Sequence, residues 1–218
     1  MSAGDPIRPT ILATRVIPNV EPAFAARLGL RAGQHSLALV TCDLDDALYV
    51  CLDEATKAAD VEVVYARSFY AGSAHASGPL SGEIIGKLAG PTPAEASAGL
   101  QACVDYAHTR AHFTSADHGD ALVFFAHAIA RTGSYLSKQA GVPPGSPLAY
   151  LVAPPLEATF AIDAALKAAD VALVNWFAPP SETNFSGAHL SGSQSAVVAA
   201  CRAFADAVFE VAALPREV

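Results

Sequence analysis

The residues best suited to hold a small charged molecule are carboxylates. Asp43-Leu44-Asp45-Asp46 places three of them within four residues, and Glu83 follows Gly82 in a separate segment. The apolar runs on both sides of the first segment predict a turn between strands. Clustered carboxylates attract an alkylammonium ion through charge and hydrogen bonds. A solvated turn is the alternative interpretation, whereas a calcium loop is not indicated because its Gly and distal Glu are missing.

No pattern in the sequence predicts catalysis. There is no G-x-S-x-G or H-E-x-x-H motif, and no Gly-rich phosphate loop stands before a helix. Gly133-Ser134 and Ser73-Ala74-His75 contain nucleophile and base types without a third residue to orient them. We therefore expect no enzyme activity, no cofactor and no built metal site. Adventitious metal binding is the most that we expect of three histidines near the middle of the chain, His108, His112 and His118.

The composition favours a protein that packs against other proteins. Of the 218 residues, 52% are hydrophobic and only 16% are charged, against about 25% charged in typical soluble domains. A net charge of −8 argues against nucleic acid as a partner. No apolar run reaches the length of a membrane span and the N-terminal residues do not resemble a signal peptide, so we expect a cytoplasmic protein with no membrane association. The four cysteines lack C-x-x-C spacing and are expected to be buried free thiols.

An internal repeat organises the chain. Residues 36–64 match residues 146–174 at a shift of 110, with about nine identities in 29 pairs, among them Lys57-Ala58-Ala59-Asp60-Val61 and Lys167-Ala168-Ala169-Asp170-Val171. Later in each half the shift falls to 101 or 102, which pairs Gly90 with Gly192 and Thr92 with Ser193. The second copy has thus lost about nine residues, in the segment that corresponds to the loop Tyr70 to Pro79. We predict two domains, residues 1–110 and residues 111–218.

Short apolar and β-branched runs predict strands, and a different spacing predicts helices. Strands are expected over Ser36 to Val40, Leu48 to Leu52 and Val61 to Tyr65. His127, in the apolar run Val123 to Ile129, is expected to be a buried histidine. Each half should be an antiparallel sheet with two helices on one face, an α+β fold.

Three helices have start, stop or periodic signals. Val197, Cys201, Phe204, Val208 and Val211 recur at steps of three or four residues and predict one face of a helix. Thr92-Pro93-Ala94-Glu95 is a capping box with Pro at the first helical position. A short helix over Glu21 to Leu28, followed by Gly29, is also predicted.

The segment Ala164 to Val174, a helix that ends in Lys-Ala-Ala followed by a strand, resembles the signature of bacterial microcompartment (BMC) shell proteins. Its echo at Lys57 makes this a tandem version. The strings Glu54 to Gly72, Arg131 to Leu136 and Tyr150 to Thr159 are similar to the shell proteins of the ethanolamine-utilization type. The resemblance implies a tandem pair of circularly permuted BMC domains. It also implies a homotrimeric pseudohexamer with a gated pore for small-molecule transport, which assembles with other shell proteins in the shell of a cytoplasmic microcompartment.

The same resemblance suggests roles for individual residues. It implies an ethanolamine site at a small acidic opening, formed by Asp45, Asp46, Glu83, Phe113 and Glu182. Lys57 and Lys167 are expected at the edges between tiles, although a solvated lysine that closes a helix is the alternative for either one. The pore is expected to be lined by the two loops that differ between the copies, with candidate residues Tyr70, Gly72, Ser73, His75, Ser181, Thr183 and Asn184.

Two other functions remain open on the sequence alone. A soluble tandem α+β metabolite sensor or carrier would bind a ligand tightly without forming sheets or tubes. An enzyme of unrecognised type would show turnover that depends on Asp45, Glu83 or His75.

Overall fold

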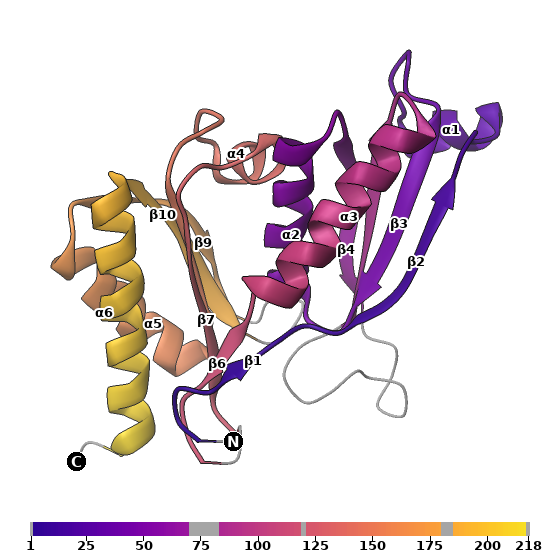
Figure 1. Cartoon of the computed structure of the whole chain (residues 1–218). Helices are drawn as coiled ribbons and strands as arrows, with labels where there is room; N and C mark the ends of the chain where they lie inside the picture. The colour runs from indigo at the N-terminus through magenta and orange to yellow at the C-terminus, as the bar shows by residue number, and fades with distance from the viewer. Residues whose placement is uncertain (1, 70–82, 119–120, 180–184, 217–218) are drawn as a thin grey trace. The chain divides into compact units, whose positions relative to one another are not determined.

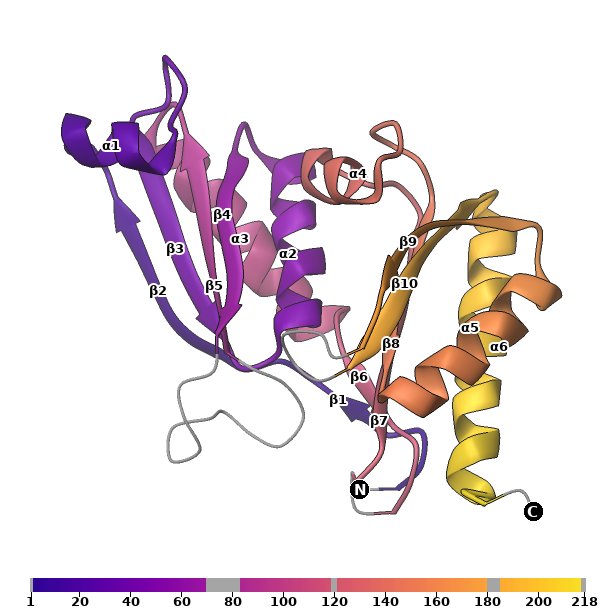
Figure 2. The ribbon, with the colours of Figure 1, turned by 180° about the vertical axis from the view of Figure 1, so that it is seen from behind.

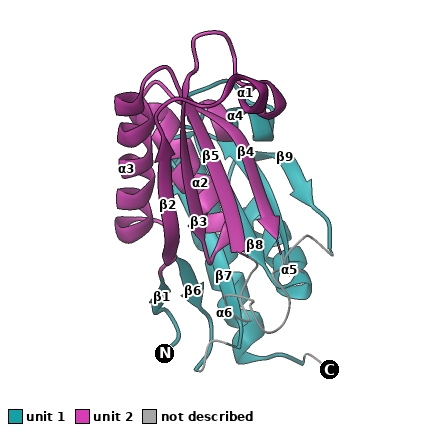
Figure 3. Cartoon of the chain, turned by 90° about the vertical axis from the view of Figure 1, so that its right-hand side faces the viewer, with its two compact units in different colours: residues 1–7, 112–132, 137–218 teal, residues 8–111, 133–136 magenta. Residues whose placement is uncertain are grey.

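The computed structural model describes residues 2–69, 83–118, 121–179 and 185–216. The chain divides into two compact units, which Figure 3 distinguishes by colour. Unit 2 contains residues 8–111 and 133–136, and unit 1 contains residues 1–7, 112–132 and 137–218. Residues 1–7, from the first half of the sequence, thus belong to unit 1. Residues 133–136, from the second half, belong to unit 2. The boundary expected between residues 110 and 111 stays a prediction.

Unit 2 is a four-stranded antiparallel sheet in the order β2-β3-β5-β4, with helices on both faces (Figure 1). The helices α2 and α3 pack together on one face, and α1 packs on the other face near Leu37 and Ala89. The elements of this unit are β2 (Ile11–Ile17), α1 (Pro22–Leu28), β3 (Ser36–Cys42), α2 (Asp45–Ala58), β4 (Glu62–Phe69), β5 (Glu83–Gly90) and α3 (Pro93–Thr109).

Unit 1 is a six-stranded antiparallel sheet in the order β1-β6-β7-β8-β10-β9, with α5 and α6 packed against one face (Figure 2). Its core lies between that face and the two helices, where Phe124, Leu151 and Phe204 are fully or almost fully buried. The elements are β1 (Pro6–Ile7), β6 (Phe113–Ser115), β7 (Val123–Ile129), β8 (Leu148–Ala153), α5 (Pro155–Ala168), β9 (Val171–Phe177), β10 (Ser186–Gly192) and α6 (Gln194–Ala213). The remaining helix, α4 (Ser134–Ala140), begins in unit 2 and ends in unit 1.

The predicted duplication is confirmed, and it extends further than the sequence comparison indicated. The order β2-β3-β5-β4 of unit 2 recurs as β7-β8-β10-β9 in unit 1. Gly29 and Gly33 have positive φ angles of 71° and 92°, and Gly141 and Gly145, which lie 112 residues later, have 66° and 87°. These backbone conformations favour glycine. The segment that contains α1 is therefore repeated as the segment that contains α4.

Two predicted strands are confirmed, and one is wrong. Ser36 to Val40 lies in β3 and Val61 to Tyr65 lies largely in β4, but Leu48 to Leu52 lies in the middle of α2. The run Leu48 to Leu52 is five apolar residues long. Periodicity cannot distinguish so short an apolar run in a buried strand from one in a buried helix, so the helix was missed. For the same reason Asp45 and Asp46 are not in a turn between strands, but in the first turn of α2.

The predicted helices are confirmed. Thr92 caps α3, because its hydroxyl accepts a hydrogen bond from the Glu95 amide at 3.1 Å, and Pro93 is the first helical residue. The capping box is only half formed, since the Glu95 carboxylate accepts a bond from the Asp60 amide at 2.7 Å instead of returning to Thr92. Within the described residues, no helix is both long and apolar enough to cross a membrane. All four cysteines are buried and free, as predicted.

Candidate functional site

Two of the predicted site carboxylates open helix α2. The residue before the helix, Leu44, has no side-chain group that could cap it, and the Asp45 carboxylate accepts a hydrogen bond from the Asp46 amide at 2.8 Å. Carboxylates are also favoured at this end by the helix dipole. Local helix physics therefore explains why acidic residues stand at these positions.

The strand register brings a third carboxylate to the same end of the unit 2 sheet. Cys42, the last residue of β3, pairs with Ile84 of β5, and Glu83 is the residue directly beyond this pair. Because α2 begins three residues after Cys42, Asp45, Asp46 and Glu83 are gathered at one end of the sheet. The sequence prediction that these carboxylates belong to one region is consistent with this placement.

Burial makes this acidic end electrostatically unusual. Asp45 is 4% exposed and Asp46 is 8% exposed, whereas Glu83 is half-buried. Burial raises the pKa of the nearby Tyr49 hydroxyl, and the proximity of Tyr135, Asp45 and Asp46 raises it further. The rings of Tyr49 and Tyr135 lie 6.3 Å apart. Buried carboxylates are stable only where donors or charges compensate them, and Asp45 and Asp46 both have such interactions within the chain.

The other two predicted ligand residues do not belong to the described part of unit 2. Phe113 belongs to unit 1, is fully buried, and packs against Phe125 and Phe185 at ring distances of 5.1 and 6.3 Å. Aromatic packing alone accounts for its position. Glu182 and the candidate pore residues Tyr70, Gly72, Ser73, His75, Ser181, Thr183 and Asn184 lie outside the described residues.

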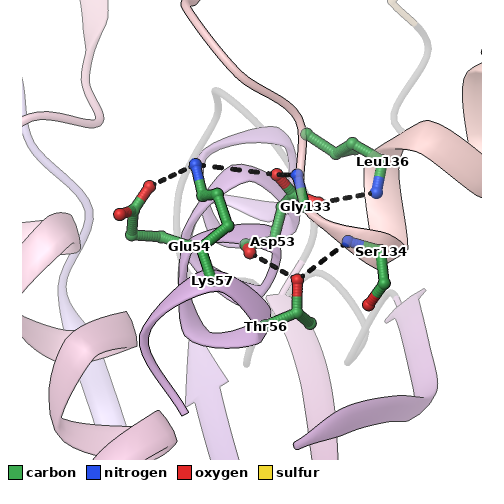
Figure 4. A network of polar contacts seen from close by, with 7 residues as sticks. All are labelled: Asp53, Glu54, Thr56, Lys57, Gly133, Ser134 and Leu136. Carbon is green, nitrogen blue, oxygen red and sulfur yellow. Dashed lines mark hydrogen bonds and ion pairs between the residues drawn. The ribbon is translucent and has the colours of Figure 1, made fainter. Parts of the chain in front are cut away.

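A polar cluster that the sequence analysis did not predict joins α2 to the start of α4 (Figure 4). The Asp53 carboxylate accepts hydrogen bonds from the Gly133 amide at 2.7 Å and the Leu136 amide at 2.8 Å. The Thr56 hydroxyl accepts one from the Ser134 amide at 3.1 Å and donates one to the Asp53 carbonyl at 2.8 Å. We call these residues the Asp53 clasp. It satisfies amides at a helix start, which have no partners within the helix.

The Asp53 clasp is buried and requires glycine at position 133. Asp53 is 1% exposed, and burial raises the pKa of its carboxyl group, although the Gly133 and Leu136 amides and the Lys57 charge oppose that shift. A Cβ atom at position 133 would lie 2.2 Å from the Thr56 hydroxyl and 2.6 Å from the Asp53 carbonyl. The only sequence signal for this contact was Gly133-Ser134 before a helix.

The two lysines expected at tile edges have different surroundings. Lys57 forms ion pairs with Glu54 and, at 3.8 Å, with Asp53, and its side chain is 27% exposed. Lys167 forms an ion pair with Asp163, and its side chain is 75% exposed. Both end a helix of the repeat, so their equivalence is structural as well as sequential. Their role at a tile edge stays a prediction.

Histidines on the unit 1 sheet are held by aromatic contacts. His189 is 2% exposed, neither ring nitrogen has a hydrogen-bond partner, and its ring meets those of Tyr150 and Phe177 edge to face at 4.4 and 4.9 Å. Burial lowers the pKa of His189 to about 4. His127, predicted to be buried, is half-buried and stacks on Phe125. Among the described residues, no three His, Cys, Asp or Glu side chains are grouped to hold a metal ion.

Known proteins resemble this chain over its whole length. The family model for the BMC domain matches residues 36–117. The bacterial microcompartment shell protein EutL of Clostridium perfringens is 57% identical over 212 residues, which cover 97% of this chain and 98% of that protein. The protein of the same name from Salmonella typhimurium is 54% identical over 215 residues, with 99% and 98% covered. The crystal structure of the ethanolamine utilization protein EutL from Leptotrichia buccalis matches all of both chains at a TM-score of 0.94 and 55% identity.

Proposed function

Because this chain belongs to the EutL family of bacterial microcompartment shell proteins, we propose that it forms a shell tile through which small molecules pass. Family membership also bears out the predicted fold, a tandem pair of circularly permuted BMC domains in which each antiparallel sheet carries packed helices. The predicted location in a microcompartment shell follows from the same membership. Its relatives are named as shell proteins, which are structural and not catalytic, and the absence of enzyme activity stays a prediction.

The duplicated fold is the observation that best supports a tile. The strand order of one unit recurs in the other, so a single chain supplies two similar building blocks. If three copies close a ring, six similar blocks surround one axis, and a homotrimer becomes a pseudohexamer. A flat ring of this kind can join other shell proteins edge to edge, and Lys57 and Lys167 are our candidates for that contact. A long lysine side chain can lie along an apolar edge while its charge reaches a carbonyl or carboxylate of the neighbour.

We further propose that the acidic end of the unit 2 sheet binds a small alkylammonium ion, with ethanolamine as the first candidate. The proposal is supported by the burial of Asp45 and Asp46 and by the register that places Glu83 at the same end of the sheet. An ammonium group would form charge-assisted hydrogen bonds with the carboxylate oxygens. The roles of Phe113 and Glu182 in this site stay predictions from the sequence. The loops 70–79 and 178–187 are proposed to line a gated central pore.

The tile proposal is tested by the assembly of the purified chain. We expect light scattering after size exclusion to give a three-chain species, and electron microscopy of concentrated protein to show flat hexagonal arrays. Lys167→Ala should reduce the arrays and leave the three-chain species intact. A strict monomer at high concentration would contradict the tile, and arrays unchanged by Lys167→Ala would remove this residue from the edge.

The ligand proposal is tested by calorimetric titration with ethanolamine. Asp46→Asn should weaken binding at least tenfold, because it removes one of the carboxylates that the ammonium group would meet. Asp105→Asn is the matched control, since Asp105 is an exposed carboxylate on α3 of the same unit. Equal affinity of Asp46→Asn and the unaltered protein would reject the site without affecting the tile proposal.

A further inference from the structure

Three of the four cysteines lie together in the core of unit 2. Cys42 ends β3, Cys51 is in the middle of α2 and Cys103 is in the middle of α3, and all three are fully buried. Cys103 interacts electrostatically with both Cys42 and Cys51, so the three sulfur atoms are close neighbours. Neither the proposed tile nor the proposed ligand site uses these thiols.

Small side chains line the contact between α2 and α3. The two helices pack together, and the buried face of α3 consists of Ala96, Gly99, Cys103 and Ala107. The buried residues of α2 include Cys51 and, one turn later, Ala55. Short side chains on both helices let the backbones approach closely. A disulfide needs this closeness, because its two Cα atoms lie within about 7 Å of each other.

Hydrogen bonds show which two thiols form a pair. The side chains of Cys51 and Cys103 are hydrogen-bonded to each other. The Cys42 sulfur instead lies 3.7 Å from both the Asp43 carboxylate and the Leu44 carbonyl, to which its thiol can donate. Cys42 is therefore engaged with the residues that precede α2, whereas Cys51 and Cys103 are engaged with each other.

Unit 1 fills the same helix contact without sulfur. At the shifts of 110 and 101, Cys51 corresponds to Ala161 of α5 and Cys103 corresponds to Phe204 of α6. Both of these residues are fully buried in the core of unit 1. A small and a large apolar side chain thus satisfy the contact there. The paired thiols are a feature of unit 2 and not a requirement of the repeated fold.

We propose that Cys51 and Cys103 are a modification site, at which hydrogen peroxide joins them in an intrachain disulfide that fastens α2 to α3. One sulfur attacks the peroxide, so that an S–O bond forms, the O–O bond breaks, and the displaced oxygen leaves as water with the thiol proton. The second sulfur then attacks the first. An S–S bond forms, the S–O bond breaks, and a second water leaves with the second thiol proton. The two sulfur atoms lose two electrons, which the peroxide gains.

Burial determines how fast the pair reacts and with which oxidant. It raises the pKa of the Cys51 thiol well above its ordinary value, and the hydrogen bond with Cys103 and the neighbouring thiols raise it further. Because the thiolate is the reactive form, the pair reacts slowly and only when α2 and α3 separate briefly. A small uncharged peroxide enters such an opening more readily than a bulky charged disulfide does. The pair therefore responds to sustained exposure to peroxide.

Overnight treatment of the folded full chain with hydrogen peroxide tests the site. We expect alkylation in denaturant to label two cysteines instead of four, and peptide mapping to find Cys51 joined to Cys103. The oxidised protein should have a higher urea midpoint than the reduced protein, because the disulfide restricts the unfolded chain. A dithiol reductant should restore the original midpoint and all four labels.

Single alanine variants provide the matched controls. Cys51→Ala introduces the residue that unit 1 has at the equivalent position, so it should fold but form no cross-link. Cys201→Ala removes a buried thiol of unit 1 and should cross-link as the unaltered protein does.

Three outcomes would overturn the proposal. They are four labelled thiols after the treatment, separate oxidation of the two sulfur atoms to sulfinic acids, and a disulfide that contains Cys42. Peptide mapping of the unaltered protein distinguishes these outcomes from the expected one even if Cys51→Ala does not fold.

Discussion

Helices α2 and α5 occupy the same place in the repeat, have the same length of 14 residues and run into the same Lys-Ala-Ala-Asp-Val segment. Their surroundings differ completely. Helix α2 begins with buried carboxylates and holds the Asp53 clasp, whereas α5 begins with Pro155 and exposes Leu156 and Phe160. The residues that build the repeat are therefore alike in the two helices, whereas the residues at equivalent outward positions differ in both polarity and exposure.

The largest expected contrast is between Asp53 and Asp163, which are equivalent in the repeat. Asp53→Ala removes the acceptor of two buried amides and should lower the free energy of unfolding by about 3 kcal/mol. Asp163→Ala removes only an exposed pair with Lys167 and should cost less than about 0.5 kcal/mol. Urea denaturation followed by circular dichroism, at one protein concentration, measures both.

Similar losses for the two variants would mean that the Asp53 clasp does not stabilise unit 2 in solution. Gly133→Ala provides an independent check, because its Cβ would collide with Thr56 and the Asp53 carbonyl without altering any charge. Gly141→Ala serves as its control. Gly141 has a φ of 66°, which strains any side chain, but no atom lies within 4 Å of the Cβ that alanine would add. Gly133→Ala should lower the free energy of unfolding more than Gly141→Ala does.

The second contrast concerns the two sheets, where His189 of unit 1 corresponds to Lys87 of unit 2. The pKa of His189 is lowered from 6.5 to about 4 by burial, so the unfolded chain binds a proton more readily than the folded chain. Stability should therefore fall as pH drops below 6.5 and level off below about 4, with a total loss of roughly 3 kcal/mol from this residue. Denaturation midpoints across this pH range measure the loss.

His189→Phe should flatten this part of the pH profile, because phenylalanine fits among Tyr150 and Phe177 and does not titrate. His127→Phe, at the half-buried histidine of the same sheet, is the control and should leave most of the slope in place. A profile equally steep with and without His189 would show that its ring is protonated, or reaches water, in the folded protein.

The sequence was sufficient to predict what depends on local pattern. The cap at Thr92 is encoded by neighbouring residues, and the repeat and the α+β class by the order in which such local patterns recur. The structure bears out all three. Helix α2 was missed because the apolar run Leu48 to Leu52 is too short to show whether its period is that of a strand or of a helix. The Asp53 clasp joins residues about 80 positions apart, and no local pattern predicts such a pair.

The candidate site was predictable only in part, because it joins residues that are distant in the sequence. Asp45 and Asp46 are neighbours in sequence, and the pairing of β3 with β5 is what brings Glu83 to them. The repeated glycines at 29 and 33 and at 141 and 145 were an available signal for the equivalence of α1 and α4. Their meaning depends on positive φ angles, which the spacing alone does not reveal.

The helix N-caps are a feature in which the two units should agree. Thr92 caps α3 and Ser193 caps α6, and each hydroxyl accepts the amide three residues on, at 3.1 and 3.2 Å. Thr92→Ala and Ser193→Ala should therefore each cost about 1 kcal/mol, measured by the same urea denaturation. If one substitution is silent and the other is not, the equivalence of the repeat fails at its helix starts, and divergence between the units is not confined to their outward surfaces.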